Sequence, residues 1–134
     1  MIKVDILVVG QISREEDGSV ISAHSTSTLI RTSDVTMVVD TGTRKFRSEI
    51  LDSFRKLNLS PGDVDTVFLT HTHFDHIENL DLYPDAKVMF FEGEVPVKGA
   101  ETVSEEFSPF PGVRIVHTPG HTPGSASVFA DGER

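Results

Sequence analysis

The chain has 134 residues, with 12 Lys plus Arg against 21 Asp plus Glu, a formal net charge of −9 and no cysteine. This length corresponds to about one domain. The acidic balance argues against a protein whose main task is to bind nucleic acid, because phosphate binding needs a basic face. The lack of cysteine excludes disulfides, thiolate-ligated zinc and thiol catalysis. No apolar run approaches roughly 18 residues and no signal peptide is recognised, so we expect a cytoplasmic protein without a membrane span.

The first third of the sequence is predicted to form strands. An apolar segment from residue 2 to residue 9 ends at Gly10, and further strands are expected at 19–23, 27–31 and 35–39. Short polar turns separate these segments. The succession predicts an antiparallel meander that is closed by the segment Asp40-Thr41-Gly42.

One long helix is predicted at 44–57, because its apolar residues fall on a single stripe at positions 46, 50, 51, 54 and 57. A Ser-Pro pair at 60–61 then indicates a short helical turn. Later strands are expected at 66–70, 87–91, 113–116 and 125–130. The acidic segment 92–112 is expected to be a loop or a loose hairpin. Its residues Phe107 and Phe110 either form the tip of a substrate lid or pack on the core.

The segment His71-Thr72-His73-Phe74-Asp75-His76 carries the strongest chemical signal, and it directly follows a predicted strand. Side chains at i and i+2 of an extended chain point the same way, so His71 and His73 can reach one ion. Asp75 and His76 follow as the chain turns, and they can face a second ion that lies about 3.5–4 Å from the first. The alternative is a polar surface cluster that binds no metal.

A catalytic zinc usually has three protein ligands and one open position for water. The candidates for the third ligand are His24, His117 and His121. His121 is favoured because prolines and glycines in the segment 118–124 fix its loop, whereas His117 ends an apolar strand and His24 is expected to be exposed. Asp40 either closes an Asx-type turn or orients a loop that carries metal ligands.

Three segments together resemble the metallo-β-lactamase-fold hydrolases, and they occur in the family's order at 39–42, 71–76 and 118–124. The resemblance implies an α+β fold, an αββα sandwich with one or two zinc ions at the edge of its sheets, and manganese or iron as alternative metals. The segment 77–84 looks more like the lactonase-type branch and the branch of metallo-β-lactamase domain-containing protein 1. By resemblance, the first metal site comprises His71, His73 and His121, the second includes Asp75 and His76, and Asp40 is a structural residue behind the ligands.

The resemblance also implies a metal-dependent hydrolase that acts on a small-molecule ester, lactone, thioester or phosphoester. Zinc lowers the pKa of its bound water to about 7, which would supply a metal-bound hydroxide as the nucleophile. Asp75 is the candidate catalytic residue, because it can orient this hydroxide or shuttle its proton. The fold alone does not name a substrate.

The end of the sequence departs from the family pattern. Asp131-Gly132 predicts a two-residue hairpin, but only two residues follow it. The family's metal-bridging Asp and last His have no counterpart after 125–130. We therefore expect residues 1–134 to be one metallo-β-lactamase-like domain truncated at the C-terminus, covering the first half to two-thirds of the sandwich. Such a chain would have a complete first site, a weaker second site, little activity and an exposed strand edge that favours a homodimer.

Two other functions stay open at the level of the sequence. An incomplete second site would also suit a non-catalytic metal-binding or interaction module. The segment Asp40-Thr41-Gly42 matches the Asp-Thr-Gly of aspartic proteases, whose small forms dimerise to pair two aspartates. The charged amphipathic helix predicted after Gly42 argues against that protease fold. No nucleic-acid partner is expected in any of these cases.

Overall fold

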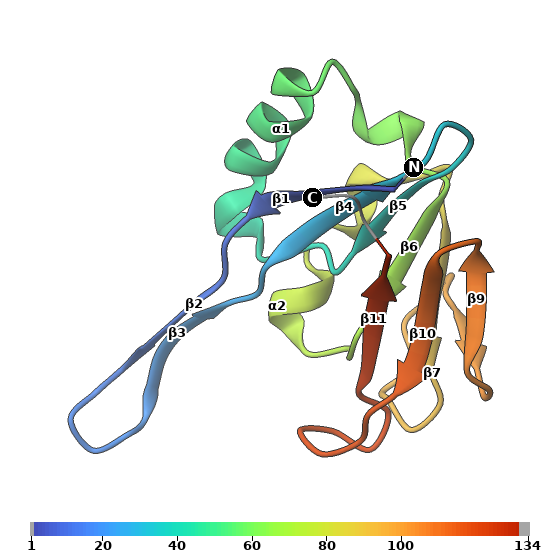
Figure 1. Ribbon diagram of the computed structural model, residues 1–134. Helices are drawn as coiled ribbons and strands as arrows, with labels where there is room; N and C mark the ends of the chain where they lie inside the picture. The colour runs from blue at the N-terminus through green and yellow to red at the C-terminus, as the bar shows by residue number, and fades with distance from the viewer. Residues whose placement is uncertain (1, 132–134) are drawn as a thin grey trace.

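The computed structural model describes residues 2–131, except for the side chains of residues 11 and 20–24. Its largest element is a six-stranded sheet (Figure 1). In spatial order the strands of this sheet are β1 (Lys3–Val8), β4 (Ser27–Arg31), β5 (Thr36–Val39), β6 (Thr66–Leu69), β7 (Lys87–Phe91) and β8 (Glu101–Val103). The pairs β1–β4 and β4–β5 are antiparallel, and the pairs from β5 to β8 are parallel.

A second, three-stranded sheet packs against one face of the large sheet (Figure 1). Its strands are β11 (Ala126–Ala130), β10 (Val113–His117) and β9 (Phe107–Phe110), all antiparallel. The helical segments are η1 (Arg44–Phe46), α1 (Arg47–Lys56), η2 (Pro61–Asp63), α2 (Phe74–Ile77) and η3 (Leu80–Leu82). Helix α1 lies over the opposite face of the large sheet from the three-stranded sheet (Figure 1). The layers therefore run helix, sheet, sheet, which are three of the four layers of the predicted αββα sandwich.

The central strands β5 and β6 of the large sheet are buried on both faces, and the alternation of their side chains shows why. On β5, Met37 and Val39 belong to the core between the two sheets, whereas Val38 belongs to the core beneath α1. Strand β6 repeats the pattern with Phe68 on one side and Val67 on the other. Because successive strand residues point to opposite faces, continuous apolar runs such as these specify a strand inside a layered fold.

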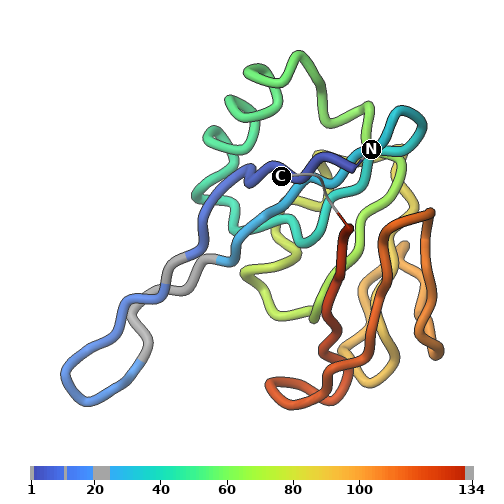
Figure 2. The backbone as a smooth tube through the Cα atoms, viewed as in Figure 1, coloured from blue at the N-terminus to red at the C-terminus, as the bar shows by residue number. Residues whose placement is uncertain are grey.

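The predicted antiparallel meander is wrong in its order. Strand β1 pairs with β4, and the intervening strands β2 (Gln11–Arg14) and β3 (Val20–His24) pair with each other. Residues 12–19 of this hairpin project away from the body of the molecule, as the backbone trace shows (Figure 2). Residues 12–19 are exposed and mostly polar, so this hairpin has no continuous apolar face with which to join the core.

The segment 92–112 is neither a loop nor a loose hairpin, the two forms that the sequence predicts, because its strands belong to different sheets. Strand β8 pairs in parallel with β7, whereas β9 pairs with β10 in the other sheet. Phe110 is buried and Phe107 packs against the core between the sheets. The two phenylalanines therefore serve the core, and the interpretation of them as the tip of a lid is wrong.

The remaining helix and strand predictions agree with the structure within a residue or two at their ends. The predicted stripe on the long helix places Ile50 and Phe54 in the core, and the Ser-Pro turn at 60–61 forms η2. The described residues include Asp131 but not Gly132, so the hairpin predicted at Asp131-Gly132 lies outside them. No helix in the described part of the chain is long and apolar enough to cross a membrane.

Candidate metal centre

The carboxyl ends of three parallel strands meet at one edge of the large sheet. Strands β5 and β6 pair Val39 with Phe68, and strands β6 and β7 pair Leu69 with Phe90. The segments that follow these strands therefore emerge side by side, beginning at residues 40, 70 and 92. A fourth segment reaches the same edge from the small sheet, because the N–H of Ala126 donates to the carbonyl oxygen of Thr70 at 2.8 Å. The residues that the sequence predicts as metal ligands lie at this edge.

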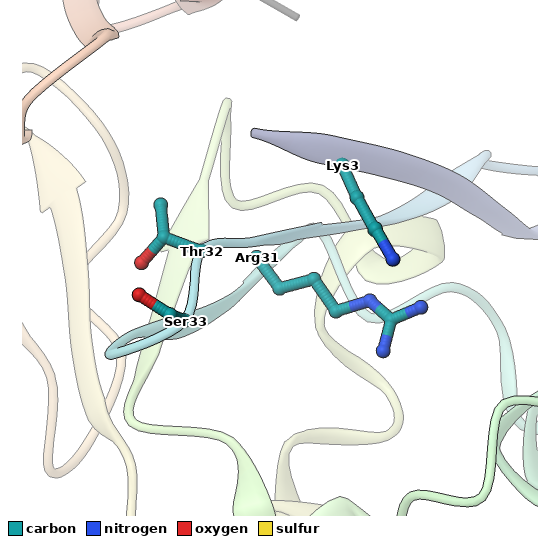
Figure 3. A pocket seen from close by; sticks show the side chains of 4 residues that line it. All are labelled: Lys3, Arg31, Thr32 and Ser33. Carbon is teal, nitrogen blue, oxygen red and sulfur yellow. The ribbon is translucent and has the colours of Figure 1, made fainter. Parts of the chain in front are cut away.

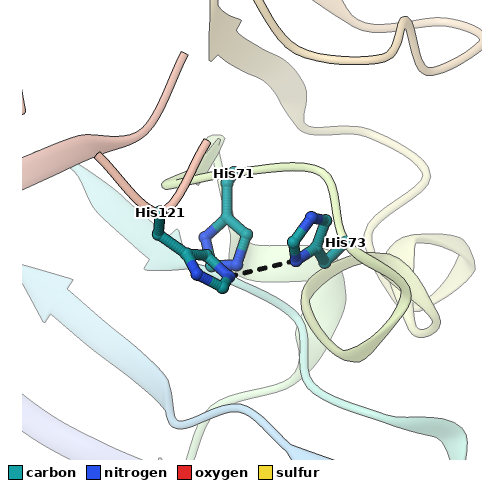
Figure 4. A group of neighbouring side chains, drawn as sticks. All are labelled: His71, His73 and His121. Carbon is teal, nitrogen blue, oxygen red and sulfur yellow. Dashed lines mark hydrogen bonds between the residues drawn. The ribbon is translucent and has the colours of Figure 1, made fainter. Parts of the chain in front are cut away.

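His71, His73 and His121 converge at this edge, although the first two and the third come from different loops (Figure 4). Nε2 of His121 lies 3.1 Å from Nδ1 of His73. The three rings are mutually spaced at 4.8 Å between centroids. One ring nitrogen from each residue lies within 4.8 Å of the others, so the three can share an ion.

This donor set fits zinc. Imidazole nitrogens are ordinary zinc ligands, and Zn–N bonds of about 2.0–2.1 Å in tetrahedral geometry place two nitrogens about 3.3 Å apart. The separation of 3.1 Å between His73 and His121 is close to that value. Both of these side chains are exposed, so solvent can reach the site.

Asp75 and His76 form a second group with His71, and their ligand atoms lie within 4.8 Å of one another. The rings of His71 and His76 are 3.7 Å apart between centroids. Nδ1 of His76 lies 2.9 Å from Oδ2 of Asp40, whereas Nε2 lies 3.6 Å from Oδ1 of Asp75. The structure therefore brings together all five residues predicted to hold metal, and their role as ligands stays a prediction.

Helix α2 is the element that turns Asp75 and His76 back toward His71. It is a single turn that begins directly after His73. The N–H and the hydroxyl of Thr41 both donate to the carbonyl oxygen of His76, at 2.8 and 2.9 Å. Asn79, which is buried, holds Thr41 in turn, because its Nδ2 donates to the carbonyl oxygen of Thr41 at 2.9 Å.

Asp40 lies behind the histidines and binds both the strand end and a ring. Its Oδ1 accepts the N–H of Thr70 at 2.8 Å, and its Oδ2 accepts the Thr70 hydroxyl at 2.7 Å. Its backbone has a φ of 60°, a left-handed conformation that Asp tolerates better than most residues. Asp40 is only 5% exposed, so its carboxylate is not free to pair across a dimer as in an aspartic protease.

The histidines differ in their affinity for protons. Burial, followed by the neighbouring charges of His76 and the other histidines, lowers the pKa of His71 from 6.5 to about 4, although Asp40 opposes the shift. Burial acts in the same direction on His76, but the Asp40 contact and the charges of Asp40, Asp75 and Glu94 raise its pKa above the ordinary value. His71 is therefore neutral at pH 7 and presents a nitrogen lone pair.

His117 has a structural role in the small sheet. Its ring stacks on Phe91 at 4.4 Å between centroids and 10° between planes, and its Nε2 lies 2.8 Å from the carbonyl oxygen of Pro123. Of these two histidines, His121 is the one grouped with His71 and His73, and its role as the third ligand stays a prediction. His24 was the remaining candidate, and its side chain lies outside the described part of the structure.

Glu94 is a residue near the site that the sequence analysis did not select. Its Oε1 accepts the N–H of Thr72 at 2.8 Å, and its Oε2 accepts the N–H of Gly124 at 3.1 Å. Glu94 is one of several acidic residues in an acidic segment, and no local spacing distinguishes it from Glu92.

A separate pocket of about 350 Å³ is lined by Lys3, Arg31, Thr32 and Ser33 (Figure 3). These residues lie near the start of β1 and in the turn between β4 and β5, at the opposite end of β5 from Asp40. Arg31 faces Asp5 at 3.7 Å, which offsets part of the positive charge there. The pocket is therefore distinct from the histidine site.

Comparison with known proteins agrees with this geometry. The chain is 39% identical over 95 residues to a probable metallo-hydrolase of Methanocaldococcus jannaschii, covering 69% of this chain and 45% of that protein. It is 30% identical over 145 residues to metallo-beta-lactamase domain-containing protein 1 of Xenopus laevis, covering 96% of this chain and 57% of that protein. The chain thus spans about half the length of these relatives.

Solved structures extend the likeness to three dimensions. A Thermotoga maritima protein assigned to the metallo-beta-lactamases superposes with a TM-score of 0.85 and 25% identity, over 98% of this chain and 73% of that one. A quorum-quenching N-acyl homoserine lactone hydrolase shares the fold with a TM-score of 0.77 and 18% identity, over 95% of this chain and 67% of that one. Residues 23–89 match the sequence profile of the Metallo-beta-lactamase superfamily. With this profile, these relatives and this fold, the chain belongs to the metallo-beta-lactamase superfamily.

Proposed function

We propose that this chain provides the metal centre of a zinc-dependent hydrolase that cleaves a small ester, lactone, thioester or phosphoester. The observation that carries the proposal is the convergence of His71, His73 and His121 from two loops that belong to different sheets. Hydrolase function in general is supported by relatives that are metallo-hydrolases and lactonases. Lactones come first in the choice of substrates to test, because a lactone hydrolase shares the fold.

When zinc is bound at such a site, it acts as a Lewis acid and activates water for nucleophilic attack. His71, His73 and His121 would hold it, and neutral His71 needs no deprotonation to do so at pH 7. Asp75 is half-buried beside His76 and can accept a proton from the nucleophile or orient it. His76 and Asp75 together could hold a second ion that stabilises charge developing on the substrate.

The test compares two histidines of adjoining segments. In His121→Ala the zinc affinity should fall by at least about 100-fold, because one of three ligands is removed. In the matched control His117→Ala, zinc binding should persist, while the free energy of unfolding falls by about 1–2 kcal/mol through the lost stacking and hydrogen bond. Zinc affinity is measured by competition with a chromogenic chelator, and turnover is measured on a lactone, a thioester and a phosphodiester.

The proposal fails if the wild-type chain retains no divalent ion after loading with zinc at neutral pH. It also fails if His117→Ala and His121→Ala weaken zinc binding equally, because His121 would then not be a ligand. Binding of zinc without turnover on any substrate class would instead favour the alternative of a non-catalytic metal-binding module.

A further inference from the structure

We propose that Glu94 is a positioning residue that joins the two loops carrying the metal ligands. The first ligand loop comprises residues 70–76, and the second ligand loop comprises residues 118–124. This inference rests on the proposed metal-dependent function, because it concerns how the ligands of that site are held in place.

The carboxylate of Glu94 contacts both loops directly. Its Oε1 accepts the N–H of Thr72, which lies between His71 and His73, at 2.8 Å. Its Oε2 accepts the N–H of Gly124, three residues after His121, at 3.1 Å. One side chain thus satisfies a backbone donor in each loop, and hydrogen bonds that involve a charged acceptor are the stronger kind.

A close backbone contact at the same place is independent of the carboxylate. A Cβ atom added at Gly124 would lie 2.6 Å from the carbonyl oxygen of Glu92 and 2.9 Å from the nitrogen of Glu94. A Cβ atom added at Gly93, where φ is +100°, would lie 3.0 Å from the nitrogen of Gly124. Only glycine permits this approach, so the turn at 92–94 is fitted against the second ligand loop.

The first ligand loop has a matching second contact. The hydroxyl of Thr72 donates to the carbonyl oxygen of Val95 at 2.9 Å.

Burial would raise the pKa of Glu94, but hydrogen bonds from Thr122, Thr72 and Gly124 outweigh the effect of burial and lower the pKa below its ordinary value. Both carboxylate oxygens therefore accept hydrogen bonds at neutral pH.

The consequence concerns the distance between ligands. His73 and His121 belong to loops that extend from different sheets, so nothing in either sheet alone fixes the 3.1 Å between their nitrogens. A link between the two loops orders them before a metal binds. Metal binding then costs less conformational entropy. Removing outer partners of metal ligands typically weakens metal affinity by about 10–100-fold.

The test uses Glu94→Ala and Glu94→Gln, with Glu92→Gln as the matched control at an exposed glutamate two residues away. Glu94→Ala should weaken zinc binding about 10–100-fold. Glu94→Gln keeps one acceptor oxygen but turns an NH₂ group toward the other N–H, so its affinity should lie between those of wild type and Glu94→Ala. Glu92→Gln should bind zinc like wild type. Cobalt substituted for zinc should show a changed visible absorption spectrum in both Glu94 variants.

A second readout needs no metal. In the metal-free chain, the amide hydrogens of Thr72 and Gly124 should exchange with solvent at least about tenfold faster in Glu94→Ala than in wild type, as measured by NMR. Unchanged exchange at both amides, or unchanged zinc affinity and cobalt spectrum in both Glu94 variants, would overturn the inference. If wild type bound no zinc and yet exchange accelerated in Glu94→Ala, the link between the loops would stand and the proposed metal function would fail.

Discussion

Asp40 shows how much one buried side chain contributes to the arrangement of this site. Its two oxygens hold the end of β6 through Thr70 and face the ring of His76. A carboxylate 2.9 Å from Nδ1 favours a proton on that nitrogen, so a neutral His76 would present the lone pair of Nε2 to a metal. Residue type alone did not distinguish a local turn from a contact with the segment 70–76, and the hydrogen bonds from Thr70 show that this contact is made.

Replacing Asp40 with Asn should change the tautomer of His76. The amide NH₂ group would donate to Nδ1, the ring proton would move to Nε2, and that nitrogen could no longer bind a metal. The weaker of two zinc ions should then lose about 10–100-fold in affinity, while the ion at the three histidines stays bound. Calorimetric titration with zinc measures both. The exposed Asp85→Asn variant is the control, and equal binding curves for the two variants would contradict the prediction.

Helix α1 and the parallel strands form the rigid support on which the ligand loops rest. Phe54 is 1% exposed and packs beside Tyr83, with ring centroids 6.1 Å apart. Ile50, one turn earlier on the same stripe, is fully buried. The two cores on either face of the large sheet hold β5, β6 and β7 in register, so the ends of these strands meet at one edge.

Phe54→Ala should lower the free energy of unfolding by about 3–5 kcal/mol, because a large buried ring is removed and the cavity collapses only partly. The exposed Lys56→Ala variant on the same helix should change it by less than about 0.5 kcal/mol. Urea unfolding of the metal-free chain measures both. A loss below about 1 kcal/mol for Phe54→Ala would mean that α1 does not pack on the sheet as described.

The molecule as a whole is acidic, with a formal net charge of −9. We expect no appreciable binding to duplex DNA at physiological salt, because too few basic residues are available to neutralise phosphates. Fluorescence anisotropy with a labelled duplex tests this. A tight complex whose affinity falls steeply with added salt would show a basic surface that the net charge conceals.

The two perturbed histidines also give stability a defined dependence on pH. The pKa of His71 falls from 6.5 to about 4, so between those pH values the unfolded chain binds more protons and stability rises with pH. The pKa of His76 is raised, so its contribution is present below about pH 6.5 and is lost as pH rises through the folded value. In the metal-free chain, the free energy of unfolding should therefore be greatest near pH 6.5.

Urea unfolding at pH 5, 6.5 and 8 in the presence of a chelator measures this profile. In His71→Asn the rise between pH 5 and pH 6.5 should become shallower, because the group responsible has been removed. An equally steep rise in this variant would assign the effect to other groups.

The local features of this protein are predictable from neighbouring residues. The helical stripe at 44–57, the strands around 66–70 and 87–91, and the spacing of His71 to His76 all depend on backbone geometry between near neighbours. Their resemblance to a family also indicated the layered fold. Such features are predictable because side chains a few residues apart are placed by the local conformation alone.

Contacts between distant residues become visible only in the folded molecule. His121 lies 48 residues after His73, and the choice between it and His117 depended on how the second ligand loop packs. The pairing of β1 with β4, the division of 92–112 between two sheets and the bridging position of Glu94 depend likewise on contacts between distant segments. No local pattern encodes these contacts, because they depend on strand register and on which apolar faces are buried together.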